Sequence, residues 1–250
     1  MISFNSYNLT TSYIIVNKVN KSDAPLREVQ SEKLSFQDGF SILSDFWRSR
    51  TIVLAGTIDA SSMGHLGTLL DDLKQNLSGV NKNLDVDYGS GTRRYKATLT
   101  RLEAPEDFYN ITFLPYHAEF ICQPFGYDTA SINVSSDDVT SASKVVDMTI
   151  EGTYKPLPII TITFDAESGA SAVAITSDFT GDTITITQGF NAGDVLIINT
   201  ETHKVTLNGT QIDFAGPIPE FGLGDGSVTV VVDRTSATYD FDLDYTPRYL

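Results

Sequence analysis

The residues of this chain that could carry out chemistry are few, and their spacing brings none of them together. The three histidines, His65, His117 and His203, lie in separate segments, without an HExxH pair or a His-x-His pair. The single cysteine, Cys122, has no second thiol to join it. Because a transition-metal site needs several convergent His or Cys ligands, none is predicted. We interpret each histidine as a surface or half-buried residue.

Nucleophilic catalysis is also poorly supported. The chain lacks a Gly-x-Ser-x-Gly turn, and Cys122 lies in a predicted strand between Ile121 and Gln123. A reactive nucleophile stands in an exposed turn beside a base, so Cys122 is interpreted as a buried structural thiol. The stretches "GTYKPLP" and "GLGDGS" are interpreted as turns, because neither has the Gly-rich pattern followed by lysine of a phosphate-binding loop. The sequence therefore predicts no catalytic residue, no cofactor and no enzymatic activity.

The acidic series Asp240, Asp242 and Asp244 raises the alternative of a calcium site. Residues spaced by two lie on one face of a strand, here opposite Phe241 and Leu243. We interpret the series as a solvated strand face, with an ion site as the alternative. The stretch "DVDYGSG" lacks the remaining ligands and the terminal Glu of a helix–loop–helix calcium site. No metal site is predicted.

The net charge limits the partners. The formal charge is −15 and the isoelectric point about 4.4, whereas a free-standing nucleic-acid binder needs a basic surface. Anionic membrane surfaces are disfavoured for the same reason. No run of eighteen apolar residues or signal-peptide pattern occurs, so we expect neither membrane insertion nor export. Without export, the Asn-x-Ser/Thr triplets at Asn8, Asn110 and Asn208 are not interpreted as glycosylation sites.

The elements are predicted to be mainly β-strands. Apolar residues make up 41% of the chain, enough to bury real cores, and β-favouring residues are plentiful. One amphipathic helix is predicted at about 62–78, begun by Ser61 or Ser62 and ended by Gly79. Its apolar stripe recurs at threes and fours: Met63, Leu66, Leu69, Leu70, Leu73 and Leu77.

The chain is predicted to form two domains. Residues 1–145 form a β domain that contains the helix, and Gly56 within its strand 51–58 indicates a bulge or a close backbone approach. The polar stretch 129–144 is interpreted as a linker or crossover. Residues 146–250 show short alternating strands with frequent turns, the pattern of a β-sandwich. The last residues, about 239–250, either close this sandwich or return to the first domain.

Six stretches, taken in order, resemble one family. They are "RSRTIVLAGTID" (48–59), "LGTLLDDLKQNL" (66–77), "RRYKATLTRLE" (93–103), "EGTYKPLPIITIT" (151–163), "AGDVLIINTETHKVTLNG" (192–209) and "DYTPRYL" (244–250). This ordered set resembles the distal tail proteins of long-tailed (siphovirus) bacteriophages over nearly the whole length. No single stretch has the specificity of a catalytic motif.

The resemblance implies a structural protein of the virion, made in the host cytoplasm. Its N-terminal β domains assemble, typically as a hexameric ring, at the hub between the tail tube protein and the tip proteins. A receptor-binding protein is a further implied partner, and DNA passes through the central channel. The second domain is implied to be a galectin-like β-sandwich outside the ring. We hypothesise that the acidic balance gives the channel a negative lining that repels DNA.

A carbohydrate-binding module that attaches the virion to its host is the alternative function. Sugar-binding galectins use His, Asn, Arg and a stacking Trp, but Trp47 belongs to the other predicted domain. His203 therefore stands in the sequence without such neighbours. Since fold alone does not establish function, we interpret the sandwich as a scaffold or docking platform. A six-subunit mass would favour the ring, and glycan binding by residues 146–233 would favour the alternative.

Overall fold

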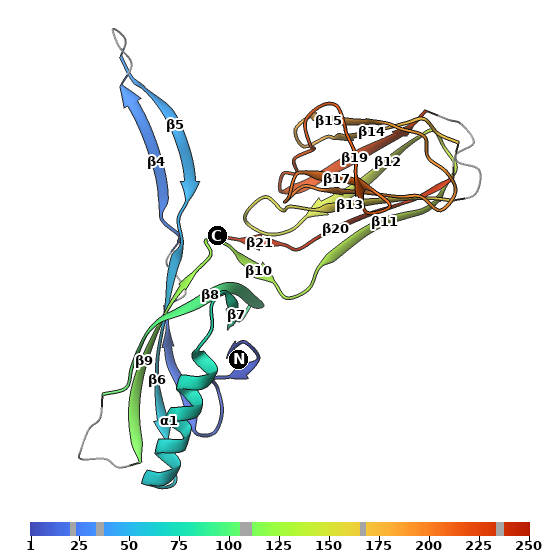
Figure 1. The fold of residues 1–250 in the computed structure, drawn as a ribbon. Helices are drawn as coiled ribbons and strands as arrows, with labels where there is room; N and C mark the ends of the chain where they lie inside the picture. Colours follow the sequence, from blue (N-terminus) through green and yellow to red (C-terminus); the bar gives the residue numbers. More distant parts are fainter. Residues whose placement is uncertain (21–23, 34–37, 106–111, 166–168, 234–237) are drawn as a thin grey trace. The chain divides into compact units, whose positions relative to one another are not determined.

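The chain folds into two units in the computed structural model, which describes residues 1–20, 24–33, 38–105, 112–165, 169–233 and 238–250. The first unit comprises residues 1–129 and the second residues 130–249. Both are built almost entirely from strands (Figure 1). The expected mainly-β class is therefore confirmed.

The first unit contains a twisted, mostly antiparallel sheet in the order β2-β1-β7-β8-β9-β6-β3, with β10 beside the start of β8. The strands are β1 (Ile2–Phe4), β2 (Tyr7–Asn8), β3 (Ile14–Val19), β6 (Arg50–Asp59), β7 (Lys82–Asp87), β8 (Thr92–Glu103), β9 (Phe113–Cys122) and β10 (Gly126–Asp128). Alternate residues of β6 and β9 are buried, as are Tyr95 and Ala97 of β8, in the period of two of a half-buried strand.

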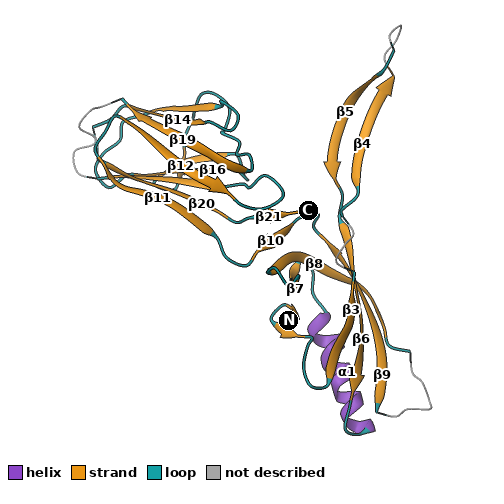
Figure 2. Ribbon diagram, turned by 180° about the vertical axis from the view of Figure 1, so that it is seen from behind, coloured by secondary structure: helices purple, strands orange, loops and turns teal. Residues whose placement is uncertain are grey.

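The predicted helix is α1 (Met63–Leu77), which lies against this sheet (Figure 2). The Ser62 side chain accepts a hydrogen bond from the His65 backbone N–H, and Gly79 follows the helix with φ of 136°. Leu73 and Leu77 are fully buried in the core beneath, whereas Met63 at the first turn is exposed. The apolar stripe thus contacts the sheet from its second turn onward.

Gly56 lies at a bulge and a close backbone approach, as its place in a strand predicted. A Cβ at this position would lie 2.2 Å from the Ile15 carbonyl oxygen and 2.6 Å from the Tyr116 ring. The register of β3 against β6 shifts at this point, between Val16 and Lys18. The missing side chain therefore admits both a bulged neighbour strand and a buried tyrosine.

Strands β4 (Arg27–Lys33) and β5 (Phe40–Trp47) form a separate two-stranded antiparallel sheet. They lie side by side as a long ribbon (Figure 1). Strand β4 was not predicted from the sequence. Its residues, "REVQSEK", are mostly exposed and too polar to carry a strand signal by themselves.

The second unit is a β-sandwich, as predicted. One sheet has the order β11-β20-β13-β16-β17-β18 and the other β12-β19-β14-β15. The strands are β11 (Ile132–Val139), β12 (Ser143–Ile150), β13 (Ile159–Phe164), β14 (Ala172–Ser177), β15 (Thr183–Thr187), β16 (Val195–Asn199), β17 (Lys204–Leu207), β18 (Thr210–Gln211), β19 (Gly224–Val232), β20 (Tyr239–Tyr245) and β21 (Arg248–Tyr249). Their inward residues form one core in which Phe164 stacks on Phe190 at 4.5 Å between ring centroids.

The stretch 129–144, expected to be a linker, instead contains β11. This strand pairs with β20, so that Asn133 lies opposite Asp244 and Ser135 opposite Asp242. The second unit therefore begins at residue 130 and not at the predicted 146. Its polar outward residues hid the strand, because only Ile132, Val134 and Val139 face the core. Residues 239–249 belong to the second unit, where β20 also pairs with β13.

Gly56→Ala tests the close approach of β3 and Tyr116. We expect it to destabilise the first unit by about 1–3 kcal/mol, because the added methyl overlaps the Ile15 carbonyl oxygen and the Tyr116 ring. Calorimetric unfolding of the full chain measures this. Gly67→Ala in α1 is the matched control, since its Cβ would meet nothing within 4 Å. Its better helix propensity should stabilise the same unit by about 0.5–1 kcal/mol. Equal effects of the two variants would contradict the packing explanation.

Candidate functional site

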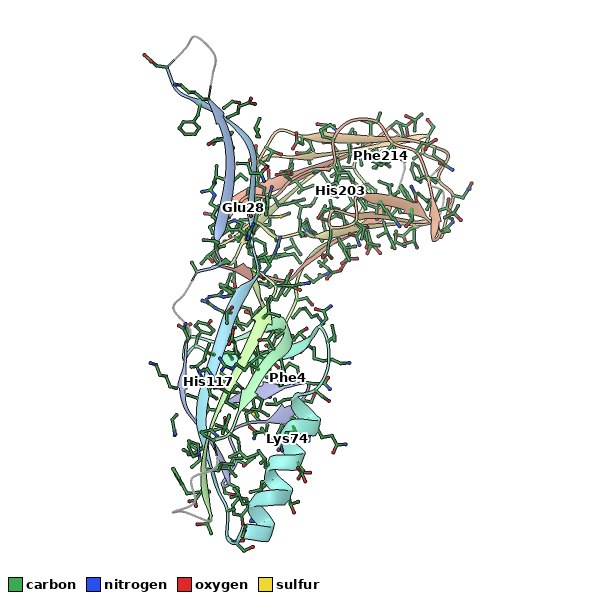
Figure 3. All side chains as sticks on the ribbon, turned by 60° about the vertical axis from the view of Figure 1, so that its left-hand side comes forward. Phe4, Glu28, Lys74, His117, His203 and Phe214 are labelled. Atoms are coloured by element: carbon green, nitrogen blue, oxygen red, sulfur yellow. The ribbon has the colours of Figure 1, made fainter. Side chains whose placement is uncertain are left out.

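The structure keeps the three histidines in different environments, as their spacing predicted. His65 lies at the start of α1, where its Nδ1 is 3.0 Å from the Ser61 Oγ and its ring meets Tyr13 edge-on. His117 lies half-buried in β9, and His203 is exposed in the turn between β16 and β17 (Figure 3). No group of three metal-binding side chains among the described residues contains a histidine or Cys122.

Cys122 is buried at the end of β9, with 2% of its surface exposed. Burial raises the pKa of its thiol to about 12, although Arg50 and the Ile52 backbone act in the opposite direction. A thiol with this pKa is protonated at neutral pH and is a poor nucleophile. The residue therefore packs the core.

The acidic residues of β20 lie on its outward face, as predicted. Asn133 donates from its Nδ2 to Asp242 and Asp244, at 3.3 and 2.9 Å. Asp240 instead lies with Asp138 and Asp165, all three with a carboxylate oxygen within 4.8 Å of one another. Partial burial, Asp240 and Asp138 raise the pKa of Asp165. This grouping depends on β11, which the sequence analysis did not find.

The acidity of the chain is concentrated in the second unit. Residues 130–249 contain 17 Asp and Glu against 5 Lys and Arg, whereas residues 1–129 contain 15 against 12. Many cations of the first unit are matched within it: Arg94 donates twice to Asp85, at 2.7 and 2.8 Å. The first unit is thus close to neutral, and the second carries most of the charge of −15.

The largest unusual feature is the ribbon β4–β5. Large apolar side chains stand exposed on it, at fractions from 46% to 65%: Leu26, Val29, Phe40, Ile42, Leu43 and Phe46. Neighbouring Ile42 and Leu43 point to opposite faces, so both faces are apolar. Two ion pairs form across it, Arg27 with Asp45 and Glu28 with Arg48, which follows β5. A long ribbon with uncovered apolar side chains is suited to contact another protein surface.

The dipeptide Asp38-Gly39 is a turn signal, but the ribbon was not predicted from the sequence. The signal that could have identified it is the dense apolar run "FSILSDFW" in β5, next to that turn. A binding surface made of ordinary apolar residues has no motif. Its function is visible only when the fold leaves those residues uncovered.

Comparisons with known proteins agree with the resemblance found in the sequence. Residues 151–249 match the family model described as siphovirus-type tail component, C-terminal domain. Over the whole chain, the fold matches the crystal structure of the SPP1 Dit (gp 19.1) protein, described as a paradigm of the hub adsorption apparatus in phages that infect Gram-positive bacteria. That match has a TM-score of 0.71, at 14% identity, and covers 100% of this chain and 98% of that one.

Two further matches are chains of the phage P2 baseplate in its activated conformation, with Ca and with Sr. Each has a TM-score of 0.45 and 10% identity and covers 96% of either chain. No curated protein sequence matches the chain. No helix among the described residues is long and apolar enough to cross a membrane.

The burial of Cys122 can be tested by thiol labelling with Ellman's reagent at pH 8. With a pKa of about 12, about one thiol in 10⁴ is ionised at that pH, against about a quarter for an ordinary cysteine. We expect labelling of the folded chain to be at least 100-fold slower than in guanidinium chloride. Cys122→Ser should remove the signal, because the chain has no other cysteine. Rapid labelling of folded protein would contradict the assignment of a buried, inert thiol.

Proposed function

We propose that this chain is a structural hub protein of a bacteriophage tail. Its residues 151–249 match the model of a siphovirus-type tail component, and its whole length has a fold similar to that of the SPP1 Dit protein. In this role, copies of the first unit assemble into a ring, with six subunits as the expected number. The ring joins the tail tube protein to the tip proteins and lets DNA pass. The chain performs no turnover and resides in the virion after synthesis in the host cytoplasm.

The observation that carries the proposal is the uncovered ribbon β4–β5. An isolated two-stranded sheet is marginally stable in water, because it has no third strand or helix to cover its apolar side chains. Phe40, Ile42 and Leu43 remain 57–64% exposed in the single chain. Contact with a second copy would remove them from water and hold the ribbon in place. Residues that are exposed in one chain and covered in an oligomer are what a ring-forming arm requires.

The distribution of charge supports the same assignment of roles. Copies with a net charge of −15 repel one another, but most of that charge lies outside residues 1–129. The nearly neutral first unit can therefore approach its copies at small electrostatic cost. The acidic second units, placed outside the ring, would keep the assembled particles apart in solution.

This distribution of charge argues against the hypothesis that the acidic balance of the whole chain gives the channel a negative lining. If first units surround the channel, its lining draws on 15 acidic and 12 basic residues and not on the acidic excess of residues 130–249. The passage of DNA would then rest on the absence of a basic, phosphate-binding surface more than on strong repulsion. The channel and the tail tube, tip and receptor-binding partners remain parts of the proposal.

Replacing Ile42 and Leu43 together by Ser tests the ribbon as the assembly element. We expect the wild type to elute with a mass near six times 27.3 kDa, measured by light scattering. The double variant should shift to the monomer, because both apolar faces of the arm lose their contacts. Negative-stain images should show rings with a central hole for the wild type and none for the variant.

Val145→Ser with Val231→Ser is the matched control. These valines are also exposed, at 53% and 40%, but they lie on the second unit. The control should keep the mass of the wild type. A monomeric wild type, or equal dissociation of the control, would overturn the proposed role of the ribbon.

A further inference from the structure

The turn that carries His203 lines a pocket within the second unit. The pocket has a volume of about 230 Å³ and lies where three loops meet. Its lining residues are Lys155, Pro156, Leu157, Thr200, His203, Ile218, Pro219, Glu220 and Phe221. The sequence shows His203 without the neighbours of a sugar-binding galectin, and its neighbours in this pocket come from loops about 15 to 50 residues away along the chain.

Two walls of the pocket are fixed by hydrogen bonds from behind. The Lys155 carbonyl oxygen accepts from the buried Arg248 guanidinium at 3.3 Å. The Glu220 carbonyl oxygen accepts from the Ser177 hydroxyl at 2.7 Å. These bonds fix the backbone from which the Lys155 and Glu220 side chains extend to the mouth, without a ligand.

The third wall is the turn after β16. The Thr200 hydroxyl, itself buried, donates to the Pro158 carbonyl oxygen at 2.8 Å. The Asn199 Oδ1 accepts from the N–H groups of Glu201 and Thr202, at 3.0 and 2.9 Å. These bonds fix the turn that presents His203. A pocket whose walls are ordered in advance requires little further ordering when a ligand binds.

The mouth combines a donor and an acceptor beside an apolar wall. Lys155 Nζ and Glu220 Oε2 form an ion pair at 2.6 Å, and their side chains are 46% and 58% exposed. His203, exposed at the rim, adds a further hydrogen-bonding group. Leu157 and Ile218, both half-buried, give the pocket an apolar surface beside the buried Pro219 and Phe221. The volume is below the roughly 300–1,000 Å³ of pockets for drug-sized ligands.

We propose that this pocket binds a single ring of a neutral saccharide. Vicinal hydroxyls can accept from Lys155 and donate to Glu220 together, while the C–H face of the ring packs on Pro219. A carboxylate or an amine would instead have to displace one partner of the ion pair. An anionic ligand would also meet the acidic excess of the second unit, 17 Asp and Glu against 5 Lys and Arg. Binding of a saccharide at this pocket does not depend on the proposed assembly into a ring.

The test is a titration of the full chain followed by the ring C–H signals of its histidines. The probes are N-acetyl-D-glucosamine, D-galactose and D-glucose, with n-butylamine and acetate as charged comparisons. The three histidines give three signals, and His203→Gln assigns one of them. We expect at least one sugar to move the His203 signal with a dissociation constant on the order of millimolar, and both charged probes to leave it unchanged.

Lys155→Met and Glu220→Gln should each weaken that sugar's binding at least tenfold. Asp242→Asn also removes one charge of the second unit, but lies outside the pocket, and should bind as the wild type does. Thermal unfolding confirms that each variant folds. The proposal is overturned if no sugar moves the signal, if a charged probe moves it more strongly, or if the two pocket variants bind the sugar as well as the wild type.

Discussion

The constraint on which the rest of the structure depends is that the ribbon β4–β5 leaves large apolar side chains exposed, which only contact with another surface can bury. Strand pairing satisfies the backbone groups that face each other across the ribbon, and Arg27 forms an ion pair with Asp45. What it cannot satisfy alone is the burial of its apolar side chains, because two strands have no core between them. The exposed apolar side chains of the ribbon lower the stability of the single chain, and they become favourable only in contact with another protein.

The two units divide the physical tasks. The first combines the ribbon with a nearly balanced charge, so the proposed apolar contact between copies would meet little repulsion. The second holds a complete core between its two sheets and most of the acidic residues, which suits a solvated, outward domain. The family model matches residues 151–249, which lie in the second unit, and the fold match covers the whole chain.

The thiol of Cys122 and the carboxylates of β20 are buried or engaged in hydrogen bonds. Cys122 is buried and protonated, and its position in β9 serves the packing beneath α1. The acidic residues of β20 are engaged with Asn133 and with the backbone of Asp138. The pocket beside His203 offers hydrogen-bonding groups and an apolar wall.

The sequence by itself determined the elements whose signals are local. Leu69, Leu70 and Leu73 lie at helical spacing, and Tyr95 and Ala97 alternate with polar residues, so α1 and β8 followed directly. Gly56 indicated a close approach to its strand, because a Cβ at this position would overlap the Ile15 carbonyl oxygen. The ordered stretches also indicated the family before any fold was known.

Only the tertiary structure decided the rest. Strand β11 was hidden because its polar outward face resembles a linker until β20 pairs with it. The apolar residues of β5 resemble those of any core strand, and only the fold shows that nothing in the described chain covers Phe40 or Leu43. Likewise, His203 acquired Lys155 and Glu220 as neighbours because loops distant in sequence meet at one end of the sandwich. Burial and convergence are properties of the packed chain, and a single sequence does not contain them.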